Sequence, residues 1–259
     1  MHTPNSNKLL FLGTGTSTGI PLLGCTCEVC KSNDKKDKRL RSSVILQLNG
    51  KHILIDVGPD FRQQMFRAAQ TRIDSCLLTH AHKDHVGGLD EVRALNVLTQ
   101  KPFDIYLDKF AIQTVVKQYD YIFEGKDYPG IPKINLHEIH ENAFQLHGIN
   151  IQPIRVMHYN LPVLGYRFGD ITYITDANFI NEEEKEKIKG SKILILNALR
   201  KETHISHYNL EQALQLIEEV KPEKTYLTHI SHHMGLHAMV EKELPTNVHL
   251  AYDELELEF

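Results

Sequence analysis

The 259-residue sequence lacks any apolar run near the roughly 18 residues that a membrane-spanning helix needs. The residues before its first apolar run, which begins at Leu9, are too few and too polar for a secretory signal peptide. We therefore expect a cytoplasmic protein without a membrane partner. Internal repeats, low-complexity tracts and linkers are also absent, which favours a single domain over residues 1–259.

An excess of positive charge is missing as well. The chain has 29 Lys and Arg against 33 Asp and Glu, a formal net charge of -4, and no basic stripe stands out. This composition disfavours nucleic acid as a partner. A small anionic substrate stays compatible with it, because bound metal ions would supply positive charge that a residue count omits.

Cysteine is scarce, with four in the chain, and three of these lie close together as Cys25, Cys27 and Cys30. A disulfide scaffold would spread its cysteines, whereas close clustering in a cytosolic chain is typical of metal binding. This CxCxxC cluster is one ligand short of a closed tetrahedral zinc site. The competing interpretation is three small buried residues in a reducing compartment.

Neither a GxGxxG fingerprint nor a P-loop occurs, and the apolar patterns indicate sheets covered by helices rather than a parallel Rossmann sheet. The polar run 31–41 is expected to be a solvated loop. Pro59 and Asn209 are expected helix-start signals. Helical periodicity predicts helices at 59–69, 89–98, 109–119, 182–188, 210–220 and 237–243. Short β-rich runs predict strands at 9–12, 44–48, 52–57, 75–79, 104–107, 149–157, 164–168, 171–175, 193–196, 225–228 and 248–252.

Potential metal ligands are concentrated at the end of the apolar strand 75–79. His80 and His82 lie two residues apart, so in an extended segment they point to the same side and can bind one ion. Asp84 and His85 lie further round the turn and can reach a second ion, and two glycines at 87 and 88 let the chain turn sharply. Imidazole and carboxylate suit Zn, Mn, Fe or Ni, and two such ions can act on a phosphodiester. The alternative is a polar loop that happens to hold three histidines.

This HxHxDH motif followed by Gly-Gly resembles the metallo-β-lactamase superfamily. The resemblance covers nearly the whole chain and implies an α/β protein with a four-layer αββα sandwich. It also implies further ligands after later strands, which match His158, Asp176 and His229. Asp56 lies near the end of the expected strand 52–57. It matches an Asp in the first part of the superfamily's sequences that orients a ligand histidine by a hydrogen bond. A simple strand-end turn residue is the rival interpretation of Asp56.

The resemblance also implies how the ligands are shared between two ions. One ion would be held by His80, His82 and His158. The other would be held by Asp84, His85 and His229, with Asp176 bridging. Mn and Zn are the leading metals for this pair.

Ligand identity narrows the branch of the superfamily. His82 in place of Glu disfavours the flavodiiron redox proteins, and Asp176 in place of Cys disfavours the zinc β-lactamases. The opening at residues 12–16 resembles the tRNase Z and PhnP-like branches, and the cysteine cluster resembles the PhnP family, which hydrolyses cyclic phosphodiesters of phosphoribose. The match of residues 226–232 to that family implies a structural zinc completed by His232, for which His233 competes.

The same resemblance implies that His207 acts as a general acid or donates to a phosphate oxygen, with His204 as a rival. His207 and Asp84 are therefore the expected catalytic residues. The implied reaction opens a small cyclic phosphodiester, such as 5-phosphoribosyl 1,2-cyclic phosphate, with His207 protonating the departing sugar oxygen. Candidates to bind the distal phosphate are Arg62, Arg155, Arg167 and Arg200. The sequence singles out none of them, and a plain surface charge is the favoured interpretation of each.

Three alternatives remain open. A tRNase Z-like ribonuclease would share the core, but segment 103–147, although long enough for a helical lid, has no Gly- and Lys-rich arm. A glyoxalase II-like thioesterase would share the ligands, but only about thirty residues follow His229, which are expected to form one helix and a strand. A non-enzymatic metal-binding protein is disfavoured because every expected ligand is intact. A homodimer is left open.

Overall fold

The computed structural model describes residues 7–124 and 129–259. These residues form two seven-stranded sheets. The first sheet contains, in spatial order, β14 (Glu256–Glu258), β1 (Lys8–Gly13), β2 (Ser43–Leu48), β3 (Lys51–Ile55), β4 (Ser75–Leu77), β5 (Phe103–Leu107) and β6 (Ile134–Glu138). The second contains β13 (Val248–Leu250), β12 (Lys224–Thr228), β11 (Ile193–Asn197), β10 (Ile171–Ile174), β9 (Leu161–Phe168), β8 (Ile149–His158) and β7 (Phe144–Leu146).

Each sheet joins an antiparallel part to a parallel part. Strands β1 to β3 pair antiparallel and β3 to β6 parallel, while β7 to β10 pair antiparallel and β10 to β13 parallel. Parallel neighbours need crossover connections, which place helices over the sheet. The carboxyl ends of parallel strands meet at one edge of a sheet, so loops after β3, β4, β10, β11 and β12 can bring side chains together.

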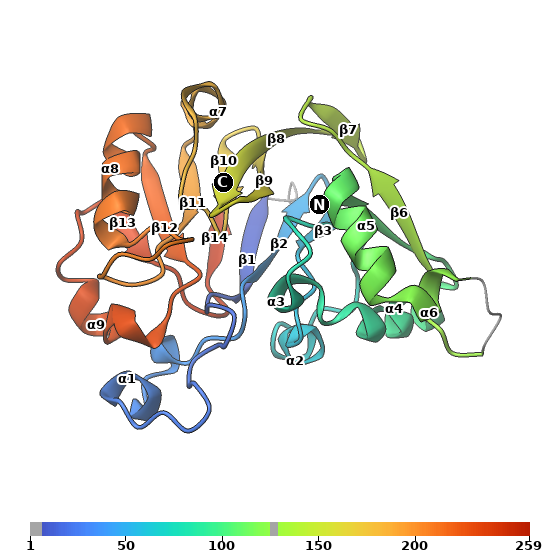
Figure 1. Ribbon diagram of the computed structural model, residues 1–259, viewed down its shortest axis with the longest axis horizontal. Helices are drawn as coiled ribbons and strands as arrows, with labels where there is room; N and C mark the ends of the chain where they lie inside the picture. The colour runs from blue at the N-terminus through green and yellow to red at the C-terminus, as the bar shows by residue number, and fades with distance from the viewer. Residues whose placement is uncertain (1–6, 125–128) are drawn as a thin grey trace, which may run out of the picture.

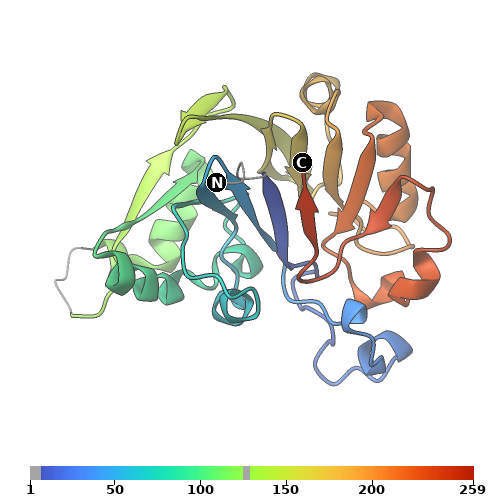
Figure 2. The same ribbon diagram turned by 180° about the vertical axis from the view of Figure 1, so that it is seen from behind.

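Helices cover the outer face of each sheet, as Figures 1 and 2 show. The first half of the chain supplies α1 (Glu28–Lys31), η1 (Lys35–Asp37), α2 (Phe61–Arg67), α3 (Lys83–Val86), η2 (Leu89–Val92), α4 (Arg93–Thr99), α5 (Lys109–Gln118) and α6 (Asp120–Phe123). The second half supplies α7 (Glu182–Ile188), α8 (Leu210–Val220), η3 (His232–Met234) and α9 (His237–Val240). No helix among the described residues has the length and apolar character needed to span a bilayer.

Three apolar clusters hold the layers together. One lies between the first sheet and α2 to α5, one between the second sheet and α7 to α9, and one between the two sheets, where Phe11 and Tyr166 are fully buried. Because both faces of each sheet are covered, central strands such as β1 are buried almost throughout rather than on alternate residues. This arrangement confirms the predicted αββα sandwich.

Local sequence explains the best-defined helices. In α8, Ala213, Ile217 and Val220 recur at helical spacing and are buried, and Asn209 and Gln212 form a reciprocal capping box at the start. The expected helix 89–98 instead divides into η2 and α4. The expected start at Pro59 is wrong by two residues, since α2 begins at Phe61.

The prediction that residues 31–41 form a solvated loop is wrong at its centre. Arg39 is only 3% exposed and donates from Nη1 to Thr14 Oγ1 at 2.8 Å and to the carbonyl of Ala251. Asp37 is also 3% exposed and accepts from the backbone N–H of His237 at 2.7 Å. A run of charges can therefore be internal when distant segments supply partners for it.

Candidate metal centres and active site

Segments at the ends of four strands deliver the candidate ligands to one place. Thr79 and His80 follow β4, and His82 precedes α3 with an extended backbone, as expected. His158 ends β8, Asp176 follows β10 and His229 follows β12. Figure 1 places α3, which carries Asp84 and His85, near the middle of the molecule.

The structure gathers all seven side chains into two adjoining groups. Within each group, one nitrogen or oxygen of every member lies within 4.8 Å of the others. The first group is His80, His82 and His158. The second group is Asp84, His85, Asp176 and His229.

Glycines are needed around the motif because a side chain would clash with neighbouring backbone, and not because the turn requires a special backbone conformation. Gly87 and Gly88 both have negative φ, which any residue can adopt, so the expected need for a sharp glycine turn is wrong. A Cβ on Gly88 would lie 2.2 Å from the carbonyl oxygen of Gly58, and one on Gly58 would lie 2.2 Å from that of Asp84. These two close backbone contacts press the loop after β3 against the motif and hold Asp84 in place.

Asp56 anchors the motif from behind. It accepts from Nδ1 of His85 at 2.7 Å and from the backbone N–H of Thr79 at 2.8 Å. Burial disfavours charge on His85, but the carboxylates of Asp176, Asp84 and Asp56 outweigh it and raise the pKa of His85 well above its usual value. A metal at Nε2 of His85 would therefore displace a proton.

Two further hydrogen bonds fix the orientation of ligand histidines. Nδ1 of His158 donates to the backbone carbonyl of Ser206 at 2.7 Å, which leaves Nε2 free to bind. Nδ1 of His80 lies 3.0 Å from Thr79 Oγ1. Nε2 of His80 is buried and has no hydrogen-bond partner among the described residues. A buried nitrogen of this kind is costly unless a ligand satisfies it, and a cation suits it. Nε2 of His85 lies 3.2 Å from a carboxylate oxygen of Asp84 and of Asp176.

The protonation states of the remaining ligands also suit metal binding. Burial lowers the pKa of His80 and of His158, so both imidazoles are neutral near pH 7. Burial opposes ionisation of Asp176, but His229 and His85 outweigh it and hold the pKa of that carboxyl well below its usual range. Neutral imidazole and ionised carboxylate are the forms that bind metals.

Three of these residues adopt the left-handed backbone region. The φ angles are 63° for Asp56, 59° for Asp176 and 55° for His229. Such conformations cost of order 1–3 kcal/mol for residues other than glycine and cluster at functional sites. Each lies one or two residues after a strand, where the turn aims its side chain at the cluster.

His207 faces the same cluster. Its Nε2 lies 3.2 Å from Oδ1 of Asp176, and its ring stacks on that of His229 with centroids 5.0 Å apart. The rival His204 lies one step further out, with its Nδ1 3.2 Å from Nδ1 of His207, and it does not reach Asp176. Ser206 contacts Nδ1 of His207 through Oγ at 3.0 Å.

The cysteine cluster forms a separate donor group with His232. Nδ1 of His232 lies 3.4 Å from Sγ of Cys25 and 3.3 Å from Sγ of Cys27, and Cys30 completes the set. All three cysteines are free thiols. His233, the expected competitor, is exposed and outside this group. In Figure 1, α1, which contains Cys30, lies below the sheets and next to α9 from the C-terminal part of the sequence.

Known proteins share this architecture. The model of the β-lactamase superfamily domain matches residues 51–230. The crystal structure of a diphosphatase from the PhnP family superposes with a TM-score of 0.91, at 38% identity and with 98% of both chains covered. The chain belongs to the PhnP family of the metallo-β-lactamase superfamily. The fold of this hydrolase superfamily implies divalent metal ions, and the family predicted from the sequence is confirmed.

Two further relatives qualify what the PhnP-family membership implies. An octanoyltransferase of Porphyromonas gingivalis is 40% identical over 252 residues, which are 96% of this chain but only 51% of that protein. About half of that protein thus lies outside the match, so its name assigns no activity to this chain. Zinc-bound PqqB of Methylobacterium extorquens is 19% identical with a TM-score of 0.79 over 97% of this chain and 100% of its own, a likeness of fold alone.

The four arginines considered as candidates for binding a distal phosphate have other partners in this PhnP-family protein. Arg155 pairs with Asp108 at 2.7 Å, and Arg62 lies over the ring of Phe66. The other two donate to backbone carbonyls: Arg167 to Gly169, Lys187 and Lys189, and Arg200 to Glu202 and Thr203. None of these four arginines therefore offers a free guanidinium to a second phosphate at the candidate cluster.

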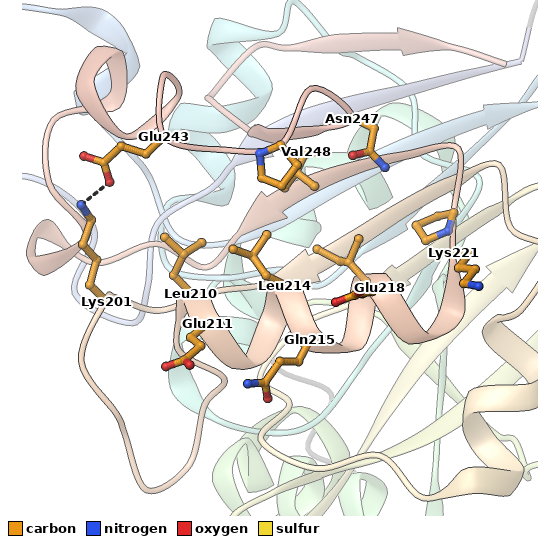
Figure 3. Close-up of a pocket in the computed structure, with 13 residues that line it drawn as sticks. Lys201, Leu210, Glu211, Leu214, Gln215, Glu218, Lys221, Glu243, Asn247 and Val248 are labelled. Atoms are coloured by element: carbon orange, nitrogen blue, oxygen red, sulfur yellow. Dashed lines mark hydrogen bonds and ion pairs between the residues drawn. The ribbon is translucent and has the colours of Figure 1, made fainter.

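Cavity size alone does not mark the site. Figure 3 shows a groove of about 820 Å³ between α8 and residues 243–248, with Leu210 and Leu214 on one wall and Val248 on the other. An ion pair of 2.6 Å between Lys201 and Glu243 closes one end. No candidate ligand lines this groove, whereas His80 and His82 line a smaller cavity of about 210 Å³.

Sequence reasoning missed two supporting residues. Thr79 donates from its backbone and its hydroxyl to Asp56, and its place directly before His80 was the available signal. Ser206 acts on His158 through a backbone carbonyl, which any residue could provide. A contact of that kind leaves no trace in the sequence.

Proposed function

We propose that this protein is a dinuclear metal-dependent hydrolase of phosphoric diesters, with a small anion such as 5-phosphoribosyl 1,2-cyclic phosphate as substrate. The observation that carries the proposal is the meeting of two donor groups at Asp176. This residue belongs to the second group, and it also lies within 4.8 Å of His158, a member of the first. A carboxylate between two sets of histidines suits a bridge between two ions.

The residues fit such ions in number and in chemistry. His80, His82 and His158 would hold one, Asp84, His85 and His229 the other, and Asp176 would bridge them. When bound, two such ions would supply a nucleophile from water at neutral pH and neutralise charge on phosphoryl oxygens. Asp84, one of the two expected catalytic residues, would thus contribute as a ligand.

His207 is the proposed proton donor to the departing oxygen. Its Nε2 faces Asp176, and its Nδ1 lies within hydrogen-bond distance of Ser206 Oγ. If Ser206 donates to Nδ1, the neutral ring carries its proton on Nε2, towards the cluster. From that side His207 can protonate a leaving alkoxide or donate to a phosphoryl oxygen.

The diphosphatase relative supports a second candidate substrate class. A phosphorus in a substituted diphosphate carries two substituted oxygens, as a diester phosphorus does. The same arrangement of donors and His207 would therefore serve cleavage of a substituted diphosphate. Both classes belong to the proposal and differ only in the leaving group.

A hydrolysis panel tests the proposal. The Mn- or Zn-loaded protein is given 5-phosphoribosyl 1,2-cyclic phosphate, cyclic and linear nucleotides, a substituted diphosphate, a tRNA precursor and S-lactoylglutathione. We expect cleavage of a small diester or diphosphate, abolished in Asp176→Asn and retained in the surface variant Asp104→Asn. Cleavage of the thioester alone, or of the tRNA precursor alone, would replace the proposal by one of the two alternative hydrolases.

A further inference from the structure

A small cavity adjoins the proposed metal ligands on the side of His82. It has a volume of about 210 Å³ and lies between α5 and the start of β9, with His80 and His82 in its wall. Across from these histidines lie Phe110 and Thr114 of α5 and Pro162 of β9. Because two of the proposed ligands line it, the cavity adjoins the place where a phosphate would bind.

The wall of the cavity carries no free cation. No Lys or Arg is among its lining residues within the described chain, and its one carboxylate, Asp108, is already satisfied. Asp108 pairs with Arg155 Nη1 at 2.7 Å and accepts from the backbone N–H of Ala111 at 2.8 Å. Arg155 is in turn shared with Glu141 at 3.0 Å. A second phosphate placed here would be desolvated without a partner.

Size and composition favour one uncharged ring. Pockets that enclose a whole ligand usually measure roughly 300–1,000 Å³, so a cavity of 210 Å³ takes a single substituent. Phe110 lines this cavity and is 62% exposed, so its ring is accessible to a substituent placed there. An aromatic face beside Pro162 and Leu161 suits a flat apolar group.

His207 contacts the cluster but does not line this cavity. The ring centroid of His158 lies 5.2 Å from that of His82, which lines the cavity, and 4.5 Å from that of His207, which does not. Since His207 would serve the departing oxygen, the cavity is left for the substituent that stays on phosphorus. We propose that it binds an uncharged ring, aryl or nucleobase, on the retained side of an open-chain diester substrate, and that Phe110 determines this preference. The inference rests on the proposed diester hydrolysis.

The test compares two diesters with the same leaving group. Bis(p-nitrophenyl) phosphate retains an aromatic ring after cleavage, whereas methyl p-nitrophenyl phosphate retains only a methyl group. In the metal-loaded enzyme, Phe110→Ala should lower kcat/KM for the first roughly 3- to 10-fold and leave the second unchanged. Thr114→Trp, a change at an exposed residue that fills the cavity, should lower the first by roughly 10-fold or more.

Phe66→Ala is the matched control, because Phe66 is an equally exposed phenyl ring on α2, at 70%, away from the metal ligands. It should leave both substrates unchanged, and all variants should keep the melting temperature of the wild type. Equal loss on both diesters in Phe110→Ala, or no loss on either, would overturn the ring-binding proposal. Failure of the wild type to cleave either diester would instead overturn the proposed function.

Discussion

Asp56 accepts a hydrogen bond from Nδ1 of His85 at 2.7 Å, and both side chains are at most 1% exposed. Bonds of this kind fix the ring of a ligand histidine and increase its basicity. Asp56→Asn should therefore weaken metal binding roughly 10- to 100-fold. Competition with a chelator dye measures this affinity.

The chain offers a matched control for that variant. Asp104 on β5 makes a similar contact of 2.8 Å to Nε2 of His137, at the surface and outside the donor groups. Asp104→Asn should leave metal affinity unchanged. Equal affinities for wild type and Asp56→Asn would show that Asp56 is only a turn residue.

His207→Ala should keep both active-site metals but slow phosphodiester cleavage by roughly 100-fold or more, because an alkoxide then departs without a proton. The loss should be smaller with p-nitrophenolate, which leaves without one. Steady-state rates on an alkyl and a nitrophenyl diester measure the difference. Equal losses on the two would argue for phosphate binding rather than proton donation.

Cys27→Ser should remove one zinc per chain and lower the melting temperature, while two other ions stay detectable by metal analysis. The reason is that Cys25, Cys27, Cys30 and His232 join segments about 200 residues apart, and three thiolates with one imidazole leave no open position for a substrate. His232 lies three residues after His229, so this clip also steadies the loop that presents His229. If wild-type protein prepared under reducing conditions has no zinc bound to these thiols, the assignment of a structural zinc site is wrong.

Two of the three thiols of this group, Cys27 and Cys30, should differ in reactivity once metal is removed by a chelator. A hydrogen bond from His232 lowers the pKa of Cys27 to about 6, whereas burial raises the pKa of Cys30 to about 11. A lowered pKa means that the thiolate is the major form above pH 6, so alkylation of Cys27 should rise with a midpoint near that pH. Peptide mass spectrometry after iodoacetamide follows both residues. A Cys27 midpoint near 9 would contradict the contact with His232.

The elements that could be predicted from the sequence are those whose signals lie within the element itself. The bounds of α8 were predicted correctly because its cap at Asn209 and its apolar spacing lie within the helix. The strands β6, β7 and β14 were missed, and all three are edge strands, where one side lacks a neighbour and the apolar pattern is short. Arg39 was misplaced in a solvated loop because its partners Thr14 and Ala251 come from distant segments.

The candidate ligands were predicted from one local motif and from residues at strand ends, in the order that the resemblance to the superfamily implies. The structure brings them together. The hydrogen bond between His85 and Asp56 was expected from the family resemblance, whereas the other hydrogen bonds that orient the ligands are not visible in the sequence. Ser206 holds His158 through a carbonyl, and the small cavity beside His82 exists only because α5 and β9 meet there. That these side chains bind metal remains a prediction.

The most direct test of that prediction is anomalous diffraction from metal-loaded crystals, recorded on both sides of the Mn or Zn absorption edge. The account predicts two ions roughly 3.5–4 Å apart in the active site. Asp176 should contact both, His158 should bind the ion shared with His80, and His229 the other. A single ion at this site, or a fully loaded site from which His158 or Asp176 points away, would contradict it.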